Sequence, residues 1–146
     1  MKKFDFKLQK LLDIRYNKEE ESKLNFSKAQ DDKTNAEENL DKLNMNYSKY
    51  SETRMHGNVV QQKTTQFYLN SLATCIDEAI SELEKKKMIL EEKRQDLKQK
   101  QVDRKTVDIL KDKQMDKYTK EVNAIEQRNN DEFALYGYIR NTAERG

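Results

Sequence analysis

The sequence predicts an all-α protein in which two long helices form an antiparallel coiled-coil hairpin, the second helix being the longer. Three observations predict this class. The 146 residues include no proline and only three glycines, the two residue types that interrupt long helices. Charged residues make up 38% of the chain and hydrophobic residues 34%, too little apolar material for a thick globular core. Hydrophobic residues also recur every seven positions, as in a left-handed coiled coil.

The first helix is expected over about residues 4–55. Near its end, Leu40, Leu43, Tyr47 and Tyr50 alternate at spacings of three and four, which marks one apolar seam. The middle of this helix is poor in apolar residues. We therefore expect its seam to hold this middle section weakly.

A turn at about residues 56–60 separates the helices. Gly57 is the only glycine before Tyr136, and glycine tolerates the left-handed conformation that ends many helices. Asn58 can cap the helix that follows. The second helix is expected over about residues 60–138, with a frayed tail at 139–146, so that residues 1–146 form a single coiled-coil domain.

The second helix carries the clearest seven-residue repeat. Its first seam position comprises Leu69, Ile76, Leu83, Leu90 and Leu97, and the same phase resumes at Tyr118, Ile125 and Ile139. A second seam position adds Ala73, Ile80, Met115, Val122 and Tyr136. Arg104 and Lys111 interrupt the first position, from which we predict a local register shift.

The segment FYLNSLATCIDEAI, residues 67–80, has more apolar residues than one seam requires. Beside the seam, a second stripe lies about 90° away around the helix. It consists of Tyr68, Leu72, Cys75 and Ala79. Composition leaves two alternatives open: the first helix covers this stripe in a widened core, or the stripe faces outward as a docking surface.

The end of the second helix is expected to have no partner within the chain. Folding at Gly57 pairs residue 4 with about residues 112–116 and leaves about 25 residues over. An apolar stripe nevertheless continues there through Tyr118, Val122, Ile125, Phe133, Tyr136 and Ile139. This stripe predicts a partner protein, and the alternative is that the N-terminus partly covers it.

Charge is segregated along the hairpin. Residues 18–38 carry a net charge of −3 and residues 85–105 a net charge of +5, and the fold places these segments opposite each other. The whole chain carries only +2, which argues against nucleic-acid and anionic-membrane binding. One cysteine and no apolar run long enough for a membrane span indicate a cytoplasmic protein.

No catalytic motif, metal site or cofactor site is recognisable, so we expect a protein that is not an enzyme. His56 is the only histidine, and it lies at the predicted turn. Cys75 lies among apolar residues, where a thiol is usually inert. The basic run near residues 84–105 is interleaved with acids and lacks stacking aromatics, so it is expected to be a solvated coiled-coil face.

Three blocks of the chain resemble the flagellar export protein FliJ family. The start, FDFKLQKLLDIR, resembles the family's F-x-F-x-L-x-x-L-L opening. Tyr68, Leu69, Leu72 and Ile76 match the end of its Y-x-x-F-I-x-x-L-x-x-x-I pattern, with Thr65 where the family usually has tyrosine. The C-terminal EVNAIEQRNNDEFALYGYIR resembles its E-x-x-x-x-E-Q-x-x-x-D-E-x-A signature through Glu121, Glu126, Gln127, Asp131, Glu132 and Ala134.

The resemblance implies a non-enzymatic part of the flagellar type III export apparatus. Members are antiparallel two-helix coiled coils that resemble the shaft of rotary ATPases. The implied partners are the hexameric export ATPase with its regulator, the cytoplasmic domain of the membrane export gate, and export chaperones. The implied location is the cytoplasmic side of the membrane at the flagellar base. A stalk protein of a virulence-type injectisome and a general cytoplasmic tether or chaperone are the alternatives.

The same resemblance implies two sets of contact residues. The gate contact falls on Tyr68, Leu72, Cys75 and Ala79, where the small Cys75 and Ala79 depart from the family's larger anchors. The contact with the ATPase ring falls on both helix ends. Its residues are Phe4, Leu8, Leu11, Leu12, Tyr118, Val122, Ile125, Phe133 and Tyr136.

Overall fold

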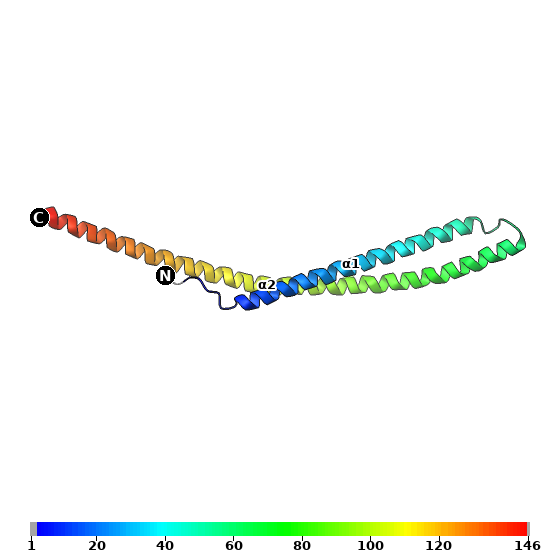
Figure 1. The fold of residues 1–146 in the computed structure, drawn as a ribbon, viewed down its shortest axis with the longest axis horizontal. Helices are drawn as coiled ribbons and strands as arrows, with labels where there is room; N and C mark the ends of the chain where they lie inside the picture. The colour runs from blue at the N-terminus through cyan, green and yellow to red at the C-terminus, as the bar shows by residue number, and fades with distance from the viewer. Residues whose placement is uncertain (1–2, 146) are drawn as a thin grey trace. The chain divides into compact units, whose positions relative to one another are not determined.

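The computed structural model describes residues 3–145 and consists of two helices. Helix α1 spans Gln9–Glu52 and helix α2 spans Val59–Arg145, and they pair in antiparallel fashion (Figure 1). The predicted hairpin with a longer second helix is confirmed. α2 extends to Arg145, so residues 139–145, which we expected to fray, are helical. Residues 1–2 and 146 of the predicted ranges lie outside the described residues.

α1 begins five residues later than expected because the chain before it packs in another conformation. Phe6 is buried and Phe4 half-buried in a non-helical segment that ends where the Gln9 amide donates to the Phe6 carbonyl over 3.0 Å. Burial of the Phe6 side chain stabilises this arrangement, whereas a terminal helical turn without packing contributes little.

The turn has the predicted glycine and cap. Gly57 has a φ of 89°, which a residue with a side chain rarely adopts. The Asn58 side chain accepts a hydrogen bond from the Gln61 amide over 2.9 Å, and the Gln61 side chain accepts one from the Asn58 amide over 3.0 Å. This reciprocal capping box satisfies two of the amides that the start of α2 would otherwise leave unpaired.

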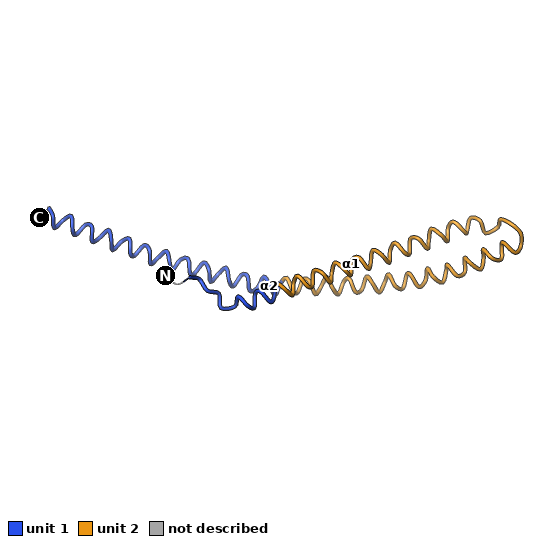
Figure 2. Tube along the Cα trace, in the orientation of Figure 1, with its two compact units in different colours: residues 1–16, 102–146 blue, residues 17–101 orange. Residues whose placement is uncertain are grey.

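The contacts of the chain divide into two compact units that share both helices (Figure 2). Unit 2 comprises residues 17–101, and unit 1 comprises residues 1–16 and 102–146. The expectation of a single domain therefore stays a prediction.

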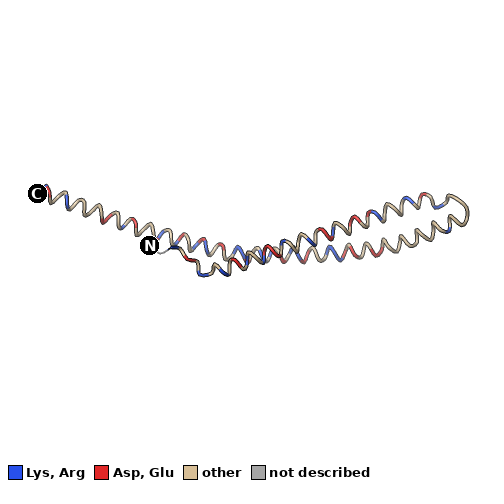
Figure 3. The backbone as a smooth tube through the Cα atoms, viewed as in Figure 1, with Lys and Arg blue, Asp and Glu red and all other residues tan. Residues whose placement is uncertain are grey.

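Two contacts define the register of unit 2. Tyr50 packs edge-on against Tyr68 with the ring centroids 4.9 Å apart, and the Ser22 hydroxyl donates to the Asp96 carboxylate over 2.7 Å. The same number of residues separates these pairs along each helix, so one antiparallel register holds between them. This register brings residues 18–38 opposite part of residues 85–105, as the charge pattern predicted. Figure 3 shows how basic and acidic residues intermingle along both helices.

The α1 seam of unit 2 keeps a seven-residue repeat, although many of its members are polar. One seam position comprises Glu19, Phe26, Lys33, Leu40 and Tyr47, and the other comprises Ser22, Ala29, Ala36, Leu43 and Tyr50. Glu19 and Ser22 are buried in spite of their polarity. Their presence explains why the middle of this helix looked weakly patterned.

The α2 seam confirms one predicted position and corrects the other. Leu69, Leu83 and Leu90 are buried, and Ile76 and Leu97 are half-buried. The second position is not the predicted Ala73 and Ile80, which are exposed. It is occupied instead by Leu72, Ala79, Lys86, Lys93 and Lys100. Both rows, the one with Ala73 and Ile80 and the one with Leu72 and Ala79, lie beside the first seam position, and the row that faces α1 is the one that is buried.

The core of unit 1 is small and apolar. Phe6, Leu12 and Val107 are its buried residues, and Phe4 and Leu11 pack against them. Phe4 also lies against Tyr118, with the ring centroids 5.6 Å apart. The N-terminal segment therefore reaches slightly further along α2 than the predicted residues 112–116.

The predicted register shift at Arg104 and Lys111 is wrong. Both residues are half-buried and keep the seven-residue phase of Leu97. Lys111 donates to the side-chain oxygen of Gln9 over 2.8 Å, and Arg104 lies over the Tyr16 ring, 5.3 Å from its centroid. Long cationic side chains fill these seam positions by covering apolar surface with their stems.

Within the part of the chain that the structure describes, neither helix contains a stretch long and apolar enough to cross a membrane.

Candidate functional site

A polar cluster in unit 1 joins the two helices. The Tyr16 hydroxyl donates to the Asp108 carboxylate over 3.0 Å, and Arg104 donates to the same oxygen over 2.9 Å. The hydrogen bond from Arg104 lowers the pKa of Asp108, and the bond from Tyr16 lowers it further, while burial opposes both. The bond to Asp108 raises the pKa of Tyr16, and burial adds to that rise. All three groups bind one another across the helix pair, so the arrangement serves packing.

Residues at the predicted gate contact are divided between the seam and the surface. Leu72 and Ala79 are each only 6% exposed and belong to the helix pairing. Tyr68 and Cys75 lie at the surface, and the Tyr68 ring packs against Tyr50. Of the two alternatives that composition left open, coverage by α1 therefore holds for Leu72 and Ala79, and exposure at the surface holds for Tyr68 and Cys75.

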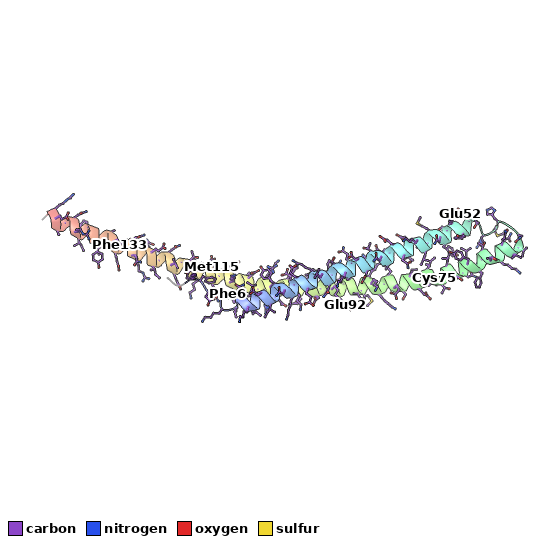
Figure 4. All side chains as sticks on the ribbon, in the orientation of Figure 1. Phe6, Glu52, Cys75, Glu92, Met115 and Phe133 are labelled. Atoms are coloured by element: carbon purple, nitrogen blue, oxygen red, sulfur yellow. The ribbon has the colours of Figure 1, made fainter. Side chains whose placement is uncertain are left out.

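Small side chains leave a groove beside this part of the seam. Its volume is about 340 Å³. The lining comes from both helices and comprises Ala36, Asn39, Leu43, Cys75, Glu78, Ala79 and Glu82. Cys75, labelled in Figure 4, lies on α2 at this groove. The small Cys75 and Ala79, which depart from the family's larger anchors, thus line a hollow that can receive a side chain from a partner. We call these residues together with Tyr68 the groove face.

Sequence reasoning missed other exposed apolar residues near the turn. Phe67 is 75% exposed, although it directly precedes Tyr68, and Ile80 is exposed although it was assigned to the seam. Val60 lies seven residues before Phe67 and is also exposed. The seven-residue spacing of Val60 and Phe67 was the feature of the sequence that could have indicated an exposed apolar row on α2.

The residues predicted to contact the ATPase ring all lie in unit 1 and differ in exposure. Phe4, Leu11, Leu12 and Tyr118 pack within the unit. Leu8 is partly exposed, and Val122 is half-buried. The outward members are Ile125, Phe133 and Tyr136. We call residues 122–145 of α2 the tail.

Nearly all of the tail is exposed. From residue 123 to residue 145 the single position that is not exposed is Gly137, which has no side chain. Phe133 is 75% exposed and Tyr136 64%, and Figure 4 shows the Phe133 side chain standing away from α2. Leu135, Tyr138 and Ile139 are exposed as well. So many uncovered apolar side chains on one helical segment are typical of a protein-binding surface.

Comparison with known proteins identifies a family. The family model described as Flagellar FliJ protein matches residues 4–143 of the chain. This range includes all of α1, α2 up to residue 143, and the groove face. Comparisons with curated proteins and with solved structures gave no significant match.

Proposed function

Because the chain belongs to the flagellar FliJ protein family, we propose that it is a non-enzymatic component of the flagellar export apparatus that acts through two docking surfaces. One surface is the tail in unit 1, and the other is the groove face in unit 2. Such a protein makes and breaks no covalent bond. Its contribution is to hold other components through apolar surfaces that the free chain leaves uncovered.

The tail is the surface proposed to enter the ring of the hexameric export ATPase. The observation that carries this proposal is the exposure of Ile125, Phe133 and Tyr136 on a helix that no other segment of unit 1 covers in the described structure. Burying a phenylalanine and a tyrosine stabilises a complex by several kcal/mol, about 1.5–3 kcal/mol for each side chain. Leu8 adds a smaller exposed patch near the start of α1.

The groove face is the surface proposed to contact the cytoplasmic domain of the export gate. Its exposed ring at Tyr68 stands beside a hollow, a combination that can anchor one apolar side chain of a partner. Leu72 and Ala79 support this surface from within the seam. Export chaperones and the regulator of the ATPase are further proposed partners, and the family relationship supports them.

These contacts correspond to a protein that works at the flagellar base on the cytoplasmic side of the membrane. The family relationship favours the flagellar apparatus over a virulence-type injectisome and over a general tether.

Capture of the purified hexameric export ATPase by the full chain tests the tail proposal. Phe133→Asp should weaken capture by more than tenfold, because a carboxylate cannot enter an apolar site without losing its hydration. Tyr138→Asp is the matched control, since Tyr138 is equally exposed but lies on the opposite side of the helix. Equal capture of the parent and the Phe133→Asp variant would refute the proposed role of the tail.

A further inference from the structure

The tail carries its own seven-residue repeat, distinct from the seam that pairs α1 with α2. Alternating steps of three and four residues connect Val122, Ile125, Asn129, Glu132, Tyr136, Ile139 and Ala143. Apart from the half-buried Val122, all of these residues are exposed. The repeat spans about three heptads, with apolar residues in the first and third and the polar Asn129 and Glu132 in the second. The stripe is therefore built to receive another helix.

The stripe is complementary to itself when two copies run in opposite directions. In one antiparallel alignment Val122 faces Ile139, and Ile125 faces Tyr136, so apolar residues meet apolar residues. In the same alignment Asn129 faces Glu132, whose carboxylate can accept a hydrogen bond from the asparagine amide. Each of these layers occurs twice, because the two copies are related by a twofold axis.

When one copy is shifted along the other by one heptad, apolar residues no longer face apolar residues. A shift of one heptad in one direction places Glu132 against Val122 and Asn129 against Ile125. The opposite shift places Glu132 against Tyr136 and Asn129 against Ile139. Both shifts bury polar groups against apolar ones, which is costly without a hydrogen-bond partner. A parallel pair would place Glu132 against Glu132, a repulsion between like charges.

One hollow on the surface of the tail has the residue spacing of a coiled-coil hole. A hollow of about 320 Å³ is lined by Asn129, Glu132, Phe133 and Tyr136. Four residues with these spacings form the hole into which a facing helix inserts one side chain in coiled-coil packing. In the matched alignment the side chain opposite this hole is Asn129 of the second copy.

We propose that two copies of this chain associate through their tails as an antiparallel coiled coil in the register that pairs Asn129 with Glu132. This inference rests on the tail sequence and surface and is independent of the proposed export function. A dimer of this kind covers the same stripe that a ring partner would need. Self-association and binding of another protein at the tail therefore exclude each other.

Sedimentation of the full chain over about a hundredfold range of concentration tests the association. The parent should show a reversible monomer–dimer equilibrium, and Ile125→Asp should weaken the dimer by more than tenfold. Tyr138→Asp, on the opposite side of the helix, should leave the equilibrium unchanged. A chain that stays monomeric throughout would overturn the proposal. A dimer that survives Ile125→Asp would do the same, because it must use another surface.

One substitution distinguishes the proposed register from the alternatives. Asn129→Lys should tighten the dimer roughly threefold to tenfold, because each new lysine faces Glu132 of the other copy. In a parallel pair the same change would place two lysines opposite each other and weaken association. A weaker dimer in this variant therefore contradicts the antiparallel alignment.

Disulfide trapping measures the register directly. In a Cys75→Ser background, a chain carrying Ile125→Cys mixed with a chain carrying Tyr136→Cys should form the crosslinked heterodimer. Ile125→Cys alone should crosslink poorly, because two copies of residue 125 lie far apart in the antiparallel pair. Efficient crosslinking of Ile125→Cys with itself would show a parallel pair and exclude the proposed register.

Discussion

At the scale of single residues, lysines at seam positions affect the stability of the helix pair. The register of unit 2 places Lys33 level with Lys86, so two half-buried cations share one layer of the helix pair. Lys33 forms an ion pair with Glu37 of its own helix over 3.4 Å, which compensates part of the repulsion. A layer of this kind lowers the stability of the pair and keeps other helices from binding in the same register.

Lys86→Leu should therefore stabilise the hairpin. The leucine removes the like-charge contact and buries apolar surface, so the free energy of unfolding should rise by about 1 kcal/mol. Urea denaturation followed by circular dichroism measures this change. Lys98→Leu, at an exposed position of the same helix, should change the stability little. A loss of stability in Lys86→Leu would show that the lysine layer is favourable.

Asp108 confers a dependence of stability on pH. Hydrogen bonds from Arg104 and Tyr16 lower its pKa in the folded chain below the ordinary 3.8. The ionised carboxylate therefore stabilises the fold above that ordinary value, and this contribution disappears as the pH falls through the lower folded value. Asp108→Asn should lower stability at neutral pH by about 1 kcal/mol and flatten the pH dependence below about pH 4.

Denaturation midpoints measured at neutral and acid pH check this expectation. Asp112→Asn, an exposed carboxylate on the same helix, is the control and should keep the acid dependence of the parent. Identical pH profiles for the parent and Asp108→Asn would mean that the Arg104–Asp108–Tyr16 cluster contributes nothing to stability.

At the scale of the helices, the two described glycines should respond to alanine in opposite ways. A β-carbon on Gly57 would collide with the Gln61 side chain that caps α2, and the φ of 89° is strained for alanine. Gly57→Ala should cost about 1–2 kcal/mol. Gly137 has open space around it within α2. Gly137→Ala should therefore stabilise the helical state of the tail by about 0.5–1 kcal/mol. Thermal melting followed by circular dichroism compares the two, and a stabilising Gly57→Ala would contradict the turn geometry.

The tail and the seam of α2 should also differ in local stability. Backbone amides in Leu83–Leu90 belong to a packed helix pair, whereas amides after residue 123 belong to a segment without packing partners in its unit. Helices are held mainly by tertiary packing, so tail amides of the monomer should exchange at least about tenfold faster. Hydrogen exchange with mass spectrometry at low protein concentration measures this difference. Equal protection along α2 would indicate that the tail is stable without a partner.

The element pattern shows how far the sequence can predict this hairpin. The repeat through Leu69, Ile76 and Leu83 identified one seam position, and the glycine with its following asparagine located the turn. The second position was assigned to the wrong row, because Ala73 and Ile80 are as apolar as Leu72 and Ala79. Only the facing α1 decides between rows that lie three and four residues from Leu69.

At the scale of the whole molecule, the two proposed docking surfaces lie in different units, the tail in unit 1 and the groove face in unit 2. Apolar residues in excess of one seam predicted an uncovered stripe in the tail, whereas for the stripe in unit 2 they left a widened core and a docking surface open. It could not predict the groove, which arises where Ala36 on α1 and Ala79 on α2 line the same hollow. A cavity formed by small residues on two helices depends on the register between the helices, and the sequence of one helix alone does not determine that register.

The groove face gives a test that separates binding from folding. Cys75→Arg fills the hollow with a large cation at an exposed position, so helicity and thermal stability should remain those of the parent. Binding to the cytoplasmic domain of the export gate, measured by titration calorimetry, should weaken by more than tenfold. Leu72→Asp introduces a charge at a buried seam position and should instead destabilise the hairpin by about 3–5 kcal/mol.

Comparison of these variants distinguishes a docking surface from a structural seam. Ser81→Arg, at an exposed position six residues further along α2, controls for the added charge and should bind the gate domain as the parent does. If Cys75→Arg also binds as the parent does, the gate contact lies elsewhere on the chain. If binding is lost only in Leu72→Asp, the hairpin fold is required but the groove face is not the contact.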